Sequence, residues 1–89
     1  MELKILKGLL SSEFYDSNKS NLSPKLFEEE LRDVYICITE GHEKYTQDLK
    51  IDDVKAIWFK NNPVATRSEK DAIDDVFKVI DREEALLDG

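Results

Sequence analysis

Apolar residues recur at helical spacing in four segments of the chain, and polar residues separate these segments. In the first segment, Leu3, Leu6 and Leu10 share one face of a helix that fades at 11–12, and the polar stretch 16–21 is predicted to be a loop. No segment alternates apolar and polar residues in the two-residue rhythm of a strand. The pattern therefore predicts an all-α fold of about four to six helices.

The second segment places a Ser-Pro turn before a long amphipathic helix. Pro24 suits a first helical turn because its missing N–H needs no partner there, and Ser23 is placed to be the N-cap. Leu26 and Phe27 are predicted to form a short turn that plugs the core, from which the helix leaves. Gly41 is expected to mark a weak point near the C-terminal end of this helix.

The third and fourth segments have recognisable starts and stops. Asp52 is the predicted N-cap of the third helix, which the Asn-Asn-Pro sequence at 61–63 ends. The fourth helix opens at Thr66, and Glu69 three residues later completes a capping box. This helix is expected to continue to about Leu87.

The fourth helix has an unusually wide apolar surface. Its main stripe consists of Ile73, Val76, Phe77, Ile80 and Leu87, and a second stripe spaced by sevens consists of Ala72, Val79 and Leu86. Together the stripes cover about half the circumference, whereas a surface helix needs only about 100°. Such a helix is either central to the core or pairs with a helix outside this chain. We predict that Ile73, Phe77 and Ile80 of the main stripe pack inward and that Ala72, Val79, Leu86 and Leu87 form a partner interface.

The same spacing predicts the core of a single domain over 1–89, divided into a head over 1–62 and a C-terminal helix over 63–89. The residues expected to fill the core and its plug are Leu6, Leu10, Leu26, Phe27, Leu31, Tyr35, Ile38, Trp58 and Phe77.

The charge balance narrows the kinds of partner. The net charge is −7, which argues against a surface that grips phosphate backbones, because such contacts need clustered Lys and Arg. A docking surface for a basic protein fits this balance better. We expect a cytoplasmic protein for three reasons. The sequence has a single cysteine, it has no apolar run long enough to span a bilayer, and it shows no secretory signal.

Catalytic signatures are missing from the sequence. There is no phosphate-binding loop, and His42, the single histidine, has no nucleophile placed beside it by a motif. We interpret His42 as an amphipathic residue at a helix edge and Cys37 as a small buried hydrophobe. The Asp pairs at 52–53 and 74–75 point about 100° apart on a helix and do not chelate together, so they are interpreted as caps and solvated faces. No catalytic residue, cofactor or metal site is predicted.

The order of these signals resembles a known domain. The stretches 5–10 (ILKGLL), 22–27 (LSPKLF), 31–38 (LRDVYICI) and 51–54 (IDDV) are similar to the N-terminal domain of DnaB-type replicative DNA helicases, most of all its phage versions. The resemblance extends over about residues 3–60. It rests on apolar patterns and turn chemistry.

The resemblance implies a non-catalytic, all-helical module that acts in DNA replication. Such a domain associates with copies of itself, as a dimer within a hexamer, and contributes to contacts with primase or a helicase loader. The ATP-dependent motor then lies elsewhere in a longer protein, located in the host cytoplasm if a phage encodes it. The helix over 63–89 would be the first arm of a pairing hairpin, with the second arm missing.

Two other interpretations remain open. The chain fits a small, complete, acidic phage or bacterial protein that binds and inhibits a basic or nucleic-acid-binding partner, with the wide apolar surface as its docking face. An enzyme is the less favoured alternative, because no nucleophile–base pair or metal set is present.

Overall fold

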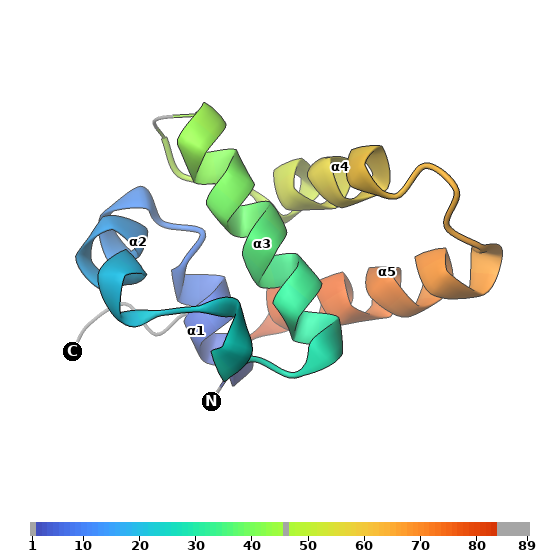
Figure 1. Ribbon diagram of the computed structural model, residues 1–89, viewed down its shortest axis with the longest axis horizontal. Coiled ribbons are helices and arrows are strands. Elements are labelled where there is room, and N and C mark those ends of the chain that lie inside the picture. The colour runs from blue at the N-terminus through green and yellow to red at the C-terminus, as the bar shows by residue number, and fades with distance from the viewer. Residues whose placement is uncertain (1, 46, 84–89) are drawn as a thin grey trace.

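The computed structural model describes residues 2–45 and 47–83, and within these residues the fold is all-α, as predicted. Its elements are α1 (Glu2–Gly8), α2 (Ser12–Asn18), the short 3₁₀ helices η1 (Lys19–Asn21) and η2 (Pro24–Leu26), α3 (Glu29–Lys44), α4 (Ile51–Asn61) and α5 (Arg67–Arg82). In Figure 1, α3 crosses α5 at the centre of the molecule, with α1 and α2 on one side and α4 on the other. No strand occurs in the described ranges.

One core joins all the α-helices. Its buried side chains are Leu6, Leu9, Leu10, Tyr15, Phe27, Leu31, Val34, Tyr35, Cys37, Ile38, Leu49, Val54, Trp58, Ile73, Phe77 and Ile80. Helix α5 contacts α1, α3 and α4, and it inserts Phe77 and Ile80 almost completely into the core. The C-terminal helix is therefore part of the packing that holds the other helices together.

The turn before α3 fills the core with one aromatic ring. Phe27 is 3% exposed and stacks on Tyr35, with 5.0 Å between the ring centroids. The guanidinium of Arg32 donates to the carbonyl oxygens of Pro24 and Phe27 at 3.2 and 3.3 Å. These bonds attach η2 to the first turns of α3 and hold the ring in place.

The prediction that Leu26 joins this plug is wrong, because its side chain is 56% exposed. Leu26 is the last residue of η2, and the backbone becomes extended at Phe27, whose side chain takes the inward direction. Ser23 does not cap the long helix either. Pro24 opens η2 instead, an extended segment follows, and α3 begins only at Glu29.

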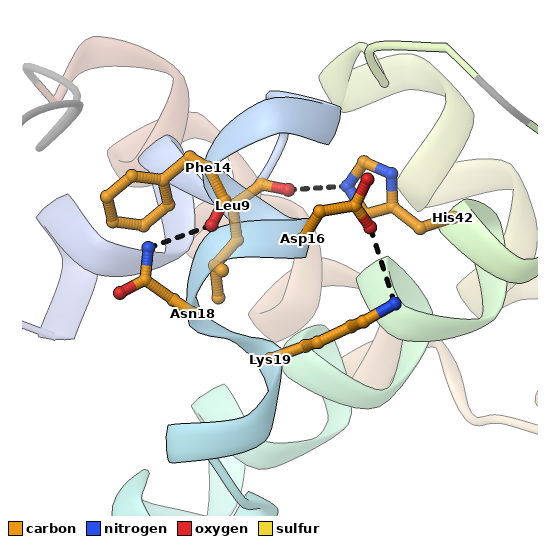
Figure 2. Close-up of polar contacts among 6 residues, drawn as sticks. All are labelled: Leu9, Phe14, Asp16, Asn18, Lys19 and His42. Atoms are coloured by element: carbon orange, nitrogen blue, oxygen red, sulfur yellow. Dashed lines mark hydrogen bonds and ion pairs between the residues drawn. The ribbon is translucent and has the colours of Figure 1, made fainter.

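The polar stretch 16–21 is helical, although a loop was predicted. Local hydrogen bonds stabilise α2: the Ser11 hydroxyl accepts from the Phe14 N–H, and the Asn18 side chain donates to the Phe14 carbonyl at 2.8 Å (Figure 2). Tyr15 is buried and anchors the helix to the core. Caps and one buried ring outweigh the low helix propensity of the Ser- and Asn-rich sequence.

The capping box at the start of the fourth helix is confirmed. The Thr66 N–H donates to the Glu69 carboxylate at 3.0 Å, and the Glu69 N–H donates to the Thr66 hydroxyl at 3.2 Å. The start predicted for the third helix is wrong. The carboxylate of Asp53 accepts from the Lys50 N–H at 3.0 Å, which starts α4 earlier and places Asp52 inside the first turn.

The segment between α3 and α4 is fixed by Leu49. Its side chain is buried, and its N–H donates to the Leu10 carbonyl at 2.7 Å. Gly41 makes room for it, because a Cβ at that position would lie 2.8 Å from a Leu49 methyl carbon. Gly41 is therefore a point of close packing inside α3, which continues without a break to Lys44.

We expect Phe27→Ala to lower the free energy of unfolding by about 3–5 kcal/mol, because it removes a buried ring and leaves a cavity. Leu26→Ala is the matched control and should change it by no more than about 0.5 kcal/mol, since its side chain is mostly in solvent. Urea unfolding followed by circular dichroism measures both. Equal losses in the two variants would contradict the assignment of Phe27 as the plug.

Candidate functional site

Two adjoining hollows run along the exposed side of α5, and we call them together the α5 groove. The larger, of ≈ 540 Å³, lies between α5, the first turn of α1 and the start of α3; the smaller, of ≈ 170 Å³, continues toward α4. Ala72 and Val76 line both hollows, so the two lie next to each other along the helix. Figure 1 shows the helices that form it, with α5 passing beneath α3 and reaching α1.

The walls of the groove are apolar. Val76 is half-buried, Val79 is 44% exposed and Ala72 is exposed, all on α5. Leu3 from α1 and Leu31 from α3 complete the larger hollow. Because Ile73, Phe77 and Ile80 face the core, the positions beside them on α5 are left on the open side. The apolar arc of α5 is wide because one part of it faces the core and the neighbouring part lines the groove.

Carboxylates line the groove together with these apolar side chains. The charged residues that line the two hollows are Glu2, Glu28, Asp33, Glu69 and Asp75, and all are acidic. Glu2 accepts a hydrogen bond from the Glu28 N–H at 3.2 Å, and Glu69 belongs to the capping box. Within the described residues, the side chains of the other three form no ion pair or hydrogen bond.

The acidic residues on another side of α5 are neutralised. Asp74 pairs with Lys55 of α4 and with Lys78, the latter at 3.2 Å. The hydrogen bond from Lys55, followed by that from Lys78, lowers the pKa of Asp74 below its ordinary value. Asp81 pairs with Lys7 at 3.6 Å. Asp75, which lines the groove, forms no such pair within the described residues.

The structure brings two of the predicted interface residues together, since Ala72 and Val79 both line the larger hollow. Leu86 and Leu87 lie outside the described residues. Sequence reasoning missed the contributions of Leu3 and Leu31, which reach the groove from other helices. Their spacing marks them only as apolar positions of α1 and α3, and nothing local shows that they meet α5.

His42 has a structural environment. Its Nε2–H donates to the Leu9 carbonyl at 2.5 Å (Figure 2), and its ring stacks on Tyr15 with centroids 4.4 Å apart. Because a carbonyl oxygen can only accept, this contact assigns the proton to Nε2. The ring joins α3 to the α1–α2 turn.

Cys37 is buried in the core at 3% exposure. Burial, followed by the charges of Glu40 and Asp33, raises the pKa of the thiol to about 12. The reactive species of cysteine is the thiolate, which this environment suppresses.

No three His, Cys, Asp or Glu side chains come together as metal ligands in the part of the chain that the structure describes. The adjacent acidic pairs illustrate the reason. Asp74 turns to lysines while Asp75 turns to the groove, so the two carboxylates do not converge.

None of the helices in the described ranges is both long and apolar enough to cross a membrane.

Comparison with family models, with characterised proteins and with solved structures gives no match. The resemblance to the helicase domain therefore rests on the residue pattern of the chain itself.

We expect Asp74→Asn to destabilise the protein near neutral pH and to matter progressively less in acid. The pKa of Asp74 is lowered in the folded state, so its contribution is present above the ordinary value of 3.8 and is lost as the pH falls through the lower folded value. Urea midpoints at several pH values measure the difference from wild type. Asp71→Asn, at an exposed position, is the control. If the difference in urea midpoint between wild type and Asp74→Asn stays constant with pH, the ion-pair assignment is contradicted.

We also expect the Cys37 thiol to react with a disulfide reagent at least about a hundredfold more slowly in the native protein than in urea, since the thiolate is scarce and the side chain is enclosed. The reaction is followed by absorbance, with Cys37→Ser as the blank. Similar rates in both states would mean that this part of α3 opens readily.

Proposed function

We propose that this chain is a non-catalytic protein-docking domain and that the α5 groove is its docking surface. One observation carries the proposal: apolar walls remain open beside five carboxylates, three of them unpaired within the described residues, while most large apolar side chains of those residues are enclosed. Exposed apolar patches with a polar rim are typical of surfaces that bind other proteins. Val79 and Ala72 would be covered only when a partner is present.

The side chains with catalytic potential do not compete with this interpretation. The His42 ring is engaged by a carbonyl and an aromatic ring, and the Cys37 thiol is buried with a raised pKa. A nucleic-acid surface is disfavoured by the acidic groove, because phosphates and carboxylates repel each other.

We further propose that the domain belongs to the N-terminal part of a DnaB-type replicative helicase. There it would act in DNA replication, associate with copies of itself and contact primase or a loader. The order of residues supports this proposal, as does the short η2 turn that delivers Phe27 to the core just before a long helix.

The acidic groove also favours a second candidate, a stand-alone protein that binds and inhibits a basic partner. The gene distinguishes the two. A phosphate-binding loop encoded in frame beyond codon 89 would support the helicase proposal, and a stop codon there would support the stand-alone protein.

Self-association of the isolated chain is expected to be weak and to strengthen with salt. Two copies that met groove to groove would place carboxylates near carboxylates, and salt screens that repulsion. Val79→Glu should abolish the association, because it adds a charge to the apolar wall. Sedimentation over a range of protein concentrations, in about 0.05 M and 0.5 M salt, is the measurement.

Val64→Glu is the matched control, since Val64 is 91% exposed in the α4–α5 connection and lines neither hollow. If Val79→Glu associates as strongly as the control, self-association does not use the α5 groove. If wild type stays monomeric at millimolar concentration, the self-associating form of the proposal is wrong, and docking of a different protein is left to be tested.

A further inference from the structure

We infer that the α5 groove binds a basic amphipathic helix of another protein, an inference that rests on the proposed docking function. The partner is one whose apolar stripe is flanked by Lys or Arg. A second copy of this chain is the less suitable occupant. The shape, the length and the charge of the groove lead to this partner.

The shape suits a helix. The groove follows α5 from Glu69 to Val79, eleven residues that span about 15 Å, which corresponds to nearly three helical turns. Its apolar lining comes from four helices: Leu3 of α1, Leu31 of α3, Trp58 of α4, and Val76 and Val79 of α5. A helix that presents apolar residues at positions i, i+3, i+4 and i+7 fills such a channel.

The charges select the flanks of that helix. Glu28 and Asp33 belong to the α3 side of the groove and Asp75 to the α5 side, and within the described residues none of their side chains is paired. A helix seated between these sides turns one flank toward each. Lysine or arginine at those flanks would meet the carboxylates, whereas Glu or Asp would be repelled.

A second copy of the chain lacks the complementary charge. Contact through a two-fold axis brings a surface against itself, and neither hollow is lined by Lys, Arg or His. Three of the lysines nearby already serve this chain, since Lys7 pairs with Asp81 and both Lys55 and Lys78 pair with Asp74. Anionic membranes and nucleic acids are repelled by the same carboxylates.

The test is a selection against the intact 89-residue chain. A displayed library of about fifteen-residue helices keeps Leu, Ile or Phe at i, i+3, i+4 and i+7 and allows Lys, Glu or Gln at the flanking positions. We expect the enriched helices to carry Lys on both flanks. A fluorescein-labelled copy of the most enriched helix should bind in the micromolar range and lose affinity as salt is added.

Matched variants distinguish binding in the groove from a general attraction between a basic helix and an acidic protein. Neutralising Glu28, Asp33 and Asp75 together, to Gln, Asn and Asn, should weaken the labelled helix at least tenfold. The control neutralises Glu13, Glu43 and Asp52, three exposed carboxylates that line neither hollow, with the same change in net charge; it should weaken binding less than threefold. Circular dichroism and urea midpoints verify that both triple variants are folded.

Three results would overturn the inference: no helix is enriched, Glu or Gln is enriched as readily as Lys, or both triple variants lose affinity equally. If in addition the chain forms dimers that Val79→Glu abolishes, the groove accommodates a second copy, and the proposed docking function stands without this partner. If neither helices nor dimers are found, the docking function fails as well.

Discussion

The fold depends on the burial of a single stripe of α5. Ile73, Phe77 and Ile80 enter a core to which α1, α3 and α4 all contribute. Phe77 and Ile80 are nearly inaccessible to solvent. Each such side chain contributes about 1.5–3 kcal/mol on burial, a large share of the stability of so small a domain. This stripe fixes the rotation of α5 about its axis. That rotation leaves Ala72 and Val79 at the surface and turns Asp75 toward the groove.

Features set by local spacing could be predicted from the sequence. The Thr66–Glu69 capping box needs only two side chains three residues apart, and the inward face of α5 follows from helical periodicity. The choice between Leu26 and Phe27 is different, because both are apolar and adjacent. The path of the chain after η2 decides which one enters the core, and that path depends on bonds from Arg32 in the next helix.

The α1 and α3 sides of the groove could not be predicted for a related reason, although Ala72 and Val79 on its α5 side were. Its walls come from residues as far apart as Leu3, Leu31 and Val79, and each reads as an ordinary apolar position of its own helix. The net charge of −7 indicated an acidic surface without locating it. Where unpaired acidic charge remains depends on which carboxylates form ion pairs. Adjacent positions on α5 point about 100° apart, so Asp74 reaches Lys55 while Asp75 faces the groove.

Under the proposed function, docking and folding would be coupled, because α5 supplies both the core and the groove. Val76 and Leu31 are packed against or within the core on one side and line the groove on the other. A helix seated in the groove would therefore cover residues that already hold α5 in place, and it would bind the folded state far better than the unfolded one. Such a ligand would raise the free energy of unfolding. Once its concentration exceeds the dissociation constant, the increase would grow with the logarithm of the ratio of the two. In the proposed complex the exposed apolar wall would be buried, so the domain would be more stable bound than free.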